Sequence, residues 1–291
     1  MRSSNPWSLL AAVWLALSWA SAGAQSLDLP EILQRGSIRI AFYNGLPPFS
    51  DKGRGIDVDV ASAVARKLGV QLAPVWFDAD ENMADDLRNM VWKGHYLGVG
   101  PADAMMHVPV DPGYISANER VLALAPYFRD GFAIAYDTRR IKRLETLEVF
   151  ARETVAVEGD TWPDSIMLAA DGGRYRDNVV HFRSGTQAVD ALKTGRVGAV
   201  FARRSELQAG LSGGTHFAVA AAPLPSGSTR EWTIGMAIKF GHDALARALE
   251  QAMSDLQSDG TLARIFAEHG VEQLDLGEKS QSPQDQKKNG L

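Results

Sequence analysis

Hydrophobic and polar positions follow two different periods along this chain. Residues 37–42 (SIRIAF) alternate and are rich in β-branched side chains, which predicts a strand. Residues 56–70 then place Val60, Val64 and Leu68 at helical spacing, which predicts a helix. A strand followed by a helix is thus the first unit of the chain.

The same alternation continues to the last third of the chain. Further strands are expected at 71–77, 132–137, 154–159, 197–202 and 232–240. Further helices are expected at 82–94, 144–151 and 185–195, followed by two helices within 242–270 that are split at Gly260. Strands that alternate with helices favour an α/β fold with a parallel sheet.

The two ends of the chain differ from this pattern. Residues 1–24 hold one arginine, an apolar stretch from Trp7 to Ala20 and the small residues Ala22-Gly23-Ala24, which predict a signal peptide with Gln25 as the mature start. A membrane anchor is the alternative, but a span needs about 20 apolar residues. Export to a periplasm follows, with no membrane insertion after cleavage. Residues 278–291 are polar and are expected to be disordered.

Composition narrows the functional classes. The 291 residues are 45% hydrophobic and 22% charged, which is ordinary for a globular chain with room for two lobes. The net charge of -5 gives no basic footprint for nucleic acid. The absence of cysteine removes disulfides, thiolate metal sites and cysteine nucleophiles, and also a lipoprotein anchor.

An ordered set of segments resembles the family-3 periplasmic solute-binding proteins. The first is GSIRIAFYNGLPPFSDKGRGIDVDVASAVARKLGV, residues 36–70, with its Pro-Pro-Phe turn and aspartate-bearing helix. The later segments that agree in order are Ala102-Asp103, 119–136, 154–161, 191–202 and 248–270. The resemblance covers the chain from about Leu29 to Val271.

This resemblance implies a type II periplasmic binding protein fold, α/β with parallel-rich sheets. Lobe 1 would comprise residues 25–135 plus 235–277, and lobe 2 residues 136–234. Two hinge crossings would fall near 133–137 and 229–234, with a small ligand bound between the lobes of a monomer. Closure of the lobes on the ligand would be a hinge motion.

A second resemblance is to a subgroup. Residues 119–136 place Pro126 six positions after Arg120, and residues 102–111 read ADAMMHVPVD. Both segments are similar to solute-binding-like accessory proteins encoded beside quinoprotein (PQQ-dependent) methanol and alcohol dehydrogenases. The implied function is a non-catalytic binding protein that assists such a dehydrogenase or its cytochrome. An ABC-transporter receptor for amino acids or organic acids, with a permease as partner, is the alternative.

Candidate ligand-binding residues in lobe 2 follow from the ends of predicted strands. Arg203 stands where the family's amino-acid binders carry an acid for the ligand ammonium, which predicts an anionic ligand rather than a zwitterionic amino acid. Asp160 and Thr161 follow a strand, where backbone N–H groups can meet an anion. Ser184 and Thr186 lie at a helix N-terminus, where one of them can instead be the helix cap.

Candidates in lobe 1 come mostly from the resemblance. Arg120 matches the arginine that grips a ligand carboxylate in the family. The GLPPF segment would place Tyr43, Leu46 and Phe49 at the cleft mouth, with the two rings as aromatic walls, although core packing is the alternative for Phe49. Asp103 is expected at the end of a strand, and Met105 is expected along the floor of the cleft.

His107 is the last candidate in lobe 1, because a cleft histidine can hydrogen-bond an anion or an alcohol. His107 could also form a metal site with His95, Asp103 and Asp111, but the irregular spacing of these residues disfavours a metal site. No metal and no cofactor are therefore expected. Residues 95–101 resemble an insertion, and its apolar Tyr96, Leu97 and Val99 predict a docking loop.

Catalysis is not expected. The chain lacks the GxSxG nucleophile elbow of a triad hydrolase. A lyase of the cyclohexadienyl dehydratase type on this fold is an alternative, with Glu158 as a buried acid near Arg120.

Overall fold

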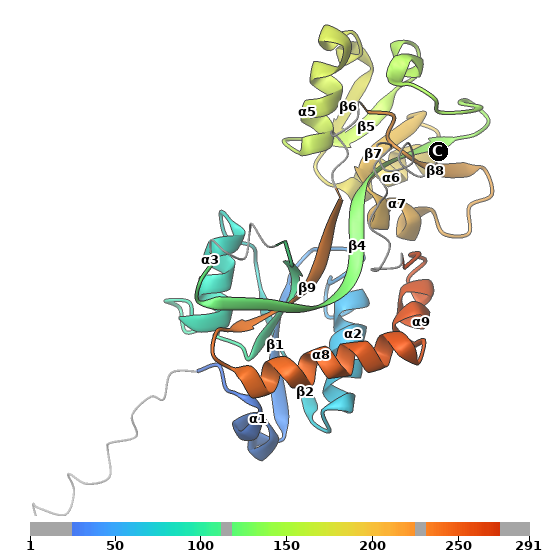
Figure 1. Ribbon diagram of the computed structural model, residues 1–291. Helices are drawn as coiled ribbons and strands as arrows, with labels where there is room; N and C mark the ends of the chain where they lie inside the picture. The colour runs from blue at the N-terminus through green and yellow to red at the C-terminus, as the bar shows by residue number, and fades with distance from the viewer. Residues whose placement is uncertain (1–24, 112–117, 225–230, 274–291) are drawn as a thin grey trace, which may run out of the picture.

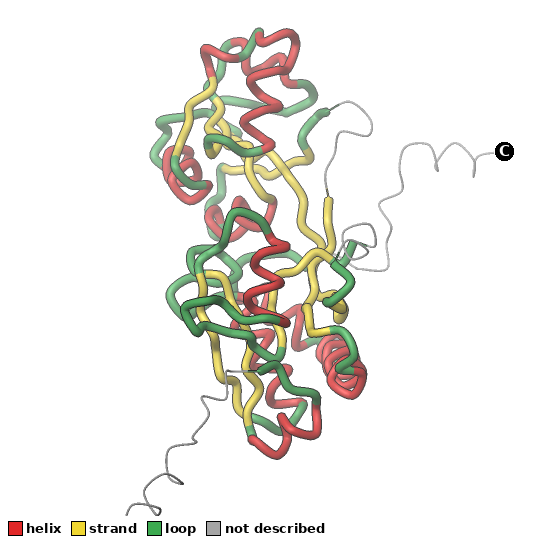
Figure 2. The backbone as a smooth tube through the Cα atoms, turned by 90° about the vertical axis from the view of Figure 1, so that its left-hand side faces the viewer, coloured by secondary structure: helices red, strands yellow, loops and turns green. Residues whose placement is uncertain are grey.

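The computed structural model describes residues 25–111, 118–224 and 231–273, and it has two lobes. Strands β4 (Val121–Asp137) and β9 (Glu231–Lys239) run from one lobe toward the other and lie side by side as an antiparallel pair (Figures 1 and 2). The predicted signal peptide and tail lie outside the described residues.

The sheet of lobe 1 has the strand order β2-β1-β3-β9-β4. Strand β1 pairs in parallel with β2 and with β3, whereas β9 is antiparallel to both of its neighbours. The sheet is therefore mixed, parallel at one edge and antiparallel toward the crossing strands. The bounds of its first three strands are β1 Ser37–Tyr43, β2 Gln71–Phe77 and β3 Ala104–Pro109.

The helices of lobe 1 pack their apolar faces on this sheet, as the spacing predicts. In α8 the buried residues include Leu245, Leu249 and Met253, and the break before α9 occurs at Gly260, which has φ 74°. The bounds are α1 Leu29–Arg35, α2 Ile56–Lys67, α3 Met83–Leu87, α8 Asp243–Ser258 and α9 Thr261–Glu268.

One glycine of lobe 1 is required by packing. Gly55 precedes α2 with φ 130°, and a Cβ atom there would lie 2.2 Å from the carbonyl oxygen of Phe49. The backbone of the Pro-Pro-Phe turn thus rests directly on the start of α2, where the N–H of Asp57 donates to the Phe49 carbonyl at 2.9 Å. This contact fixes the turn against lobe 1.

Lobe 2 has a second sheet in the order β4-β7-β5-β6, with β8 added on β4. Strand β5 is parallel to β6 and β7, while β4 is antiparallel to β7 and β8. Strand bounds are β5 Val155–Glu158, β6 Val179–Phe182, β7 Ala199–Arg203 and β8 Phe217–Ala221. Helix bounds are α5 Trp162–Ala169, α6 Gly185–Lys193 and α7 Arg204–Leu211.

Strand β4 belongs to both sheets and changes partner in the middle. Gly131 pairs with Glu231 of β9, and Phe132 pairs with Arg203 of β7. The strand is continuous through this change, so the lobe boundaries predicted at residues 135 and 234 stay an interpretation.

The crossing is tied to helix α7 by a buried carboxylate. The hydroxyl of Ser205 donates to Asp130 Oδ2 at 2.6 Å, and its backbone N–H donates to Oδ1 at 3.3 Å. Arg204 donates to the carbonyl of Arg129 at 2.6 Å. These hydrogen bonds fix the start of α7 to this part of β4.

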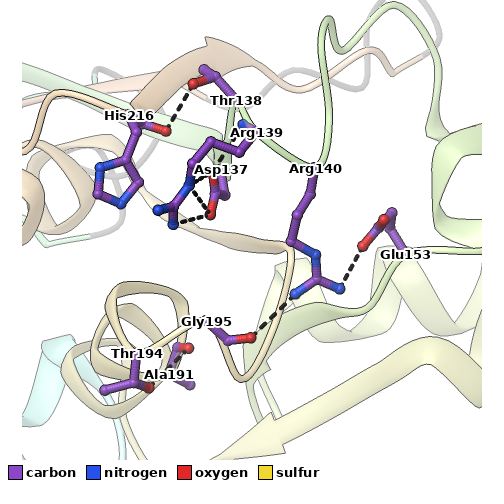
Figure 3. A network of polar contacts seen from close by, with 9 residues as sticks. All are labelled: Asp137, Thr138, Arg139, Arg140, Glu153, Ala191, Thr194, Gly195 and His216. Atoms are coloured by element: carbon purple, nitrogen blue, oxygen red, sulfur yellow. Dashed lines mark hydrogen bonds and ion pairs between the residues drawn. The ribbon is translucent and has the colours of Figure 1, made fainter.

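The far end of β4 is held by a separate polar network, shown in Figure 3. Asp137 accepts two hydrogen bonds from Arg139 Nε and one from Nη2, which holds the pKa of the Asp137 carboxyl down at about 2. Arg140 donates to Glu153 at 2.6 Å and to the carbonyl of Gly195 at 3.3 Å. These contacts fix the loop after β4 on lobe 2.

Several elements differ from the sequence-based expectation. The helix expected at 82–94 is α helix only to Leu87 and continues as a π-helical turn, Arg88–Trp92. The helix expected at 144–151 is a short 3-10 turn, Leu147–Ala151. Helices α1, α5 and α7 and strands β6 and β8 were not predicted, because each is only four to eight residues long and gives little periodicity.

Candidate functional site

A cavity of about 280 Å³ lies between the two lobes. We call it the interlobe cavity. Among the described residues, lobe 1 contributes to it only Leu46, from the Pro-Pro turn, and the other lining residues come from β4, β5, β7 and the start of α5 and α7. They are Phe132, Glu158, Thr161, Pro163, Phe201, Ala202, Arg203 and Glu206.

The parallel strands of lobe 2 place the polar residues of the cavity. Glu158 is the last residue of β5 and Arg203 the last of β7, so both lie at carboxyl ends of neighbouring strands. Thr161 precedes α5, and its hydroxyl donates to the Glu158 carbonyl at 2.6 Å. Ligands commonly bind at this edge of an open α/β sheet.

Arg203 is already paired with a carboxylate. Its Nη2 lies 2.6 Å from Oε1 of Glu206, three residues along on α7, and the two side chains are 22% and 9% exposed. Burial lowers the pKa of Arg203, but the charge and hydrogen bond of Glu206, together with the charges of Asp130 and Glu158, outweigh burial, so the pKa is raised. Arg203 therefore remains charged, and Glu206 neutralises that charge.

Glu158 has a different environment. Its Oε2 accepts a hydrogen bond from the backbone N–H of Gly185 at 3.0 Å, at the start of α6. Burial raises the pKa of the Glu158 carboxyl, and the negative charge of Glu206 raises it further. A Cβ atom at Gly185 would lie 2.7 Å from Glu206 Oε2, so the two carboxylates approach each other around this glycine.

Aromatic rings form the apolar part of the site. Phe132 stacks on Trp162 with ring centroids 4.9 Å apart, and Phe201 meets both rings edge-on at 6.4 Å and 5.9 Å. Trp232 of β9 packs on Phe132 at 5.1 Å. The site thus combines an aromatic cluster with a few charged groups, as is common for small-molecule pockets.

A second cavity of about 250 Å³ adjoins the first and shares Glu206 with it. We call it the side cavity. Lobe 1 again contributes only residues of the turn, Pro47 and Pro48. Helices α6 and α7 supply Thr186, Val189, Asp190, Lys193, Glu206, Ala209 and Gly210.

Three of the five candidates in lobe 2 line one of these cavities: Thr161, Thr186 and Arg203. Ser184 instead caps α6, where its hydroxyl accepts from the N–H of Gln187 at 3.3 Å. Asp160 is exposed and lines neither cavity, and its N–H donates to Asp164 at 3.0 Å.

In lobe 1 the aromatic and methionine candidates are buried in packing. The ring of Tyr43 packs at a tilt on Phe77, with centroids 4.6 Å apart, and its hydroxyl donates to Asp86 at 2.8 Å. Phe49 is fully buried, which is the core-packing alternative, and Met105 is fully buried as well. Neither cavity includes any of the three candidates.

Asp103 and Arg120 lie at the end of the lobe 1 sheet that is remote from the crossing. Asp103 is fully buried, accepts from the N–H groups of Leu27 and Arg39 at 3.1 Å and 2.7 Å, and pairs with Arg35. The guanidinium of Arg120 lies 4.8 Å from the ring centroid of Trp92. Neither residue lines the interlobe cavity.

His107 belongs to a buried cluster inside lobe 1. Its backbone N–H donates to the hydroxyl of Tyr127 at 3.2 Å, and that hydroxyl donates to Asp57 at 2.6 Å. The His107 ring lies 4.3 Å from Phe49, and its Nδ1 is 3.2 Å from Asp57 Oδ2 without hydrogen-bond alignment. The cluster connects β3, β4 and α2.

Two features of the site were not predicted from the sequence. Glu206 follows Arg203 by three residues, which is the spacing of a helical ion pair, but α7 was not predicted. Phe132 and Phe201 were assigned to strands without a role in the cleft. Glu158 was named, but only as an acid for a lyase.

The described residues also bear on whether the site could bind a metal ion and whether a helix could span a membrane. Within residues 25–111, 118–224 and 231–273, no group of three or more histidine, aspartate or glutamate side chains is placed to hold a metal ion. Nor is any helix in the same ranges long and apolar enough to cross a membrane.

Many solved structures resemble this chain. An ancestral cationic amino acid solute-binding protein aligns over 83% of this chain and 99% of its own, with a TM-score of 0.64 and 19% identity. The L-cystine solute receptor of Neisseria gonorrhoeae, in an unliganded open conformation, aligns over 86% and 100%, with a TM-score of 0.59 and 17% identity. The chain has the two-lobed fold of solute-binding proteins.

A third neighbour is an amino acid ABC transporter substrate-binding protein of Streptococcus pneumoniae bound to L-arginine, with 17% identity, 84% and 99% coverage and a TM-score of 0.57. No protein-family model and no curated protein matches the chain. At these identities the likeness shows the fold, and it confirms the predicted type II architecture.

Proposed function

We propose that this protein is a non-catalytic, periplasmic receptor that binds a small solute in the interlobe cavity and delivers it to an ABC permease. The observation that carries the proposal is the cavity itself, which combines Leu46 of lobe 1 with Glu158, Thr161 and Arg203 of lobe 2. Solved neighbours of the same fold are described as solute receptors and as ABC-transporter substrate-binding proteins.

The expected anionic ligand finds no support in this geometry. The expectation depended on Arg203 facing the ligand with an uncompensated positive charge. Its ion pair with Glu206 neutralises that charge, and Glu158 adds a further carboxylate to the same cavity. A buried ion pair offers little net attraction to an anion.

A ligand screen by thermal shift tests the proposal. A ligand at about 100 times its Kd stabilises the folded protein by about 2.7 kcal/mol, so a true ligand raises the Tm. Leu46→Trp would fill the cavity from lobe 1 and should abolish the shift. Leu33→Trp, at a half-exposed position on α1, is the matched control and should leave the shift unchanged.

A second candidate is the accessory role beside a PQQ-dependent dehydrogenase. The observation that favours it is the exposed loop in which Tyr96, Leu97 and Val99 are 88%, 70% and 39% exposed. A pull-down from periplasm separates the two functions, because a receptor recovers permease subunits and an accessory protein recovers the dehydrogenase or its cytochrome.

A lyase remains the third candidate. One neighbour of 19% identity is described as an ancestral amino acid-binding protein and a precursor of cyclohexadienyl dehydratase. The raised pKa of Glu158 suits a general acid. The lyase alternative also expects Arg120 near Glu158, but Arg120 lies over the ring of Trp92 instead. Mass spectrometry of each ligand after incubation with the protein detects or excludes turnover.

A further inference from the structure

Although the charge of Arg203 acts on Glu158, this carboxylate has no ion pair of its own among the described residues of the interlobe cavity. Two acids and one base line it, and Arg203 forms its ion pair with Glu206. Throughout the part of the chain that the structure describes, Glu158 forms no ion pair, and Gly185 N–H is the one hydrogen-bond donor to its carboxylate. A half-buried carboxylate in this state attracts either a proton or a ligand cation.

The walls around Glu158 suit an organic cation with an apolar body. Phe132, Phe201, Pro163 and Leu46 line the same cavity. Ring faces attract ammonium groups, and apolar walls favour burial of a hydrocarbon body. A volume of about 280 Å³ lies at the small end of ligand pockets, so the body must be small.

Within residues 25–111, 118–224 and 231–273, each basic side chain that lines either cavity already has an acidic partner for its charge. Arg203 is engaged by Glu206, and Arg120 lies on Trp92. Lys193 lines the side cavity and lies 3.6 Å from Asp190 on its own helix. A zwitterion would therefore bury its carboxylate without a partner, which costs affinity.

We propose that the ligand is a small primary amine with an apolar body and no carboxylate, and that its ammonium binds Glu158. This inference rests on the proposed receptor function and specifies its ligand class. Phe132 and Phe201 hold the body, and the Arg203–Glu206 pair closes the charged end of the cavity.

Calorimetry with two matched sets of probes tests the inference. Phenethylamine, 3-phenylpropionate and L-phenylalanine share a phenyl body, and isopentylamine, 4-methylpentanoate and L-leucine share a branched aliphatic body. In at least one set the amine should bind at least tenfold more tightly than the acid and the amino acid. Preference for the acid or the amino acid overturns the inference and leaves the receptor function standing.

Variants locate the binding charge. Glu158→Gln keeps the shape and the acceptor for Gly185 but removes the charge, and should weaken amine binding at least tenfold. Glu145→Gln removes the same charge from an exposed position in lobe 2 and should change it less than twofold. Equal losses in both variants would mean that only net charge matters, which overturns the inference.

Arg203→Gln separates cation binding from anion binding. It leaves Glu206 unpaired in the cavity, so amine affinity should be retained or increased. A tenfold loss of amine affinity in a variant that stays folded, as its Tm reports, overturns the inference. The proposed receptor function itself would fail on a different result. In that result no probe of either set binds, and the broader thermal-shift screen finds no ligand whose binding Leu46→Trp blocks. The inference about the amine would then fail as well.

Discussion

The two sides of the interlobe cavity differ in chemistry. Lobe 2 presents Glu158, Thr161, Arg203 and Glu206, whereas lobe 1 presents only Leu46. The side cavity repeats the contrast, since lobe 1 contributes Pro47 and Pro48 there and lobe 2 contributes the charged groups. In the proposed receptor, recognition of the ligand's charge would fall to lobe 2, and the apolar turn of lobe 1 would cover the ligand.

The polar candidates of lobe 1 are used for structure instead. Asp103 holds the N-terminal segment on the sheet, and Tyr127, Asp57 and His107 connect two strands to a helix. Substitutions of these buried polar residues of lobe 1 should therefore change stability without changing affinity, and substitutions of the charged residues of lobe 2 that line the cavity should change affinity. The predictions below test this contrast.

The largest effect is expected for Asp103→Ala. It leaves the N–H groups of Leu27 and Arg39 and the guanidinium of Arg35 without their acceptor, so the free energy of unfolding should fall by about 3 kcal/mol. Urea denaturation measures this loss. The affinity of the folded fraction for its ligand should stay within twofold. Unchanged stability with lost binding would place Asp103 in the site and break the contrast.

Tyr127→Phe should have the next largest effect. The hydroxyl is fully buried and donates to Asp57 at 2.6 Å, so its removal should cost about 1 to 2 kcal/mol of stability and leave ligand affinity unchanged. Tyr175→Phe in lobe 2 is the matched control. That hydroxyl makes only a 3.5 Å contact with Asp171, so the loss should be a few tenths of a kcal/mol. Equal losses in the two variants would contradict this account.

The fold was more predictable from the sequence than the site was. Strand and helix periods place β1, α2, β5, α6 and α8, and a residue at the end of a strand in lobe 2, such as Arg203, does reach the cavity. The family resemblance placed Asp103 at a strand end in the cleft, whereas Asp103 directly precedes β3 and its carboxylate accepts from the N–H groups of Leu27 and Arg39, because a short matching segment does not fix where a side chain points. The Arg203–Glu206 pair could not be foreseen without α7, whose eight residues give a weak pattern.

A smaller effect is expected from pH, with opposite signs for two carboxyls. The pKa of Asp137 is lowered to about 2, so its stabilisation is complete above the unfolded pKa of about 4 and is lost as the pH falls through 2. The pKa of Glu158 is raised by burial and by Glu206, so stability falls as the pH rises from about 4 through its folded pKa.

Two variants separate these contributions in melting curves recorded at several pH values. Arg139→Ala should remove much of the acid-side dependence attributed to Asp137, since Arg139 is its largest stabilising partner. Glu158→Gln should remove the opposite dependence, although Arg203 and Glu206 still face that position. Amine binding should also strengthen as Glu158 ionises. An unchanged pH profile in Glu158→Gln would show that this carboxyl does not titrate as described.

The smallest effect on stability is expected in the exposed apolar loop of lobe 1 that holds Tyr96 and Leu97. The double variant Tyr96→Asp with Leu97→Asp should change the free energy of unfolding by no more than about 0.5 kcal/mol, because the two side chains are 88% and 70% exposed. Leu87→Asp, at a position of lobe 1 that is 1% exposed, is the matched control and should unfold the protein. The double variant should also keep its ligand affinity while losing whichever periplasmic or permease partner the unchanged protein recovers in a pull-down. A large loss of stability would mean that the loop packs on lobe 1, and full retention of the partner would mean that docking occurs elsewhere.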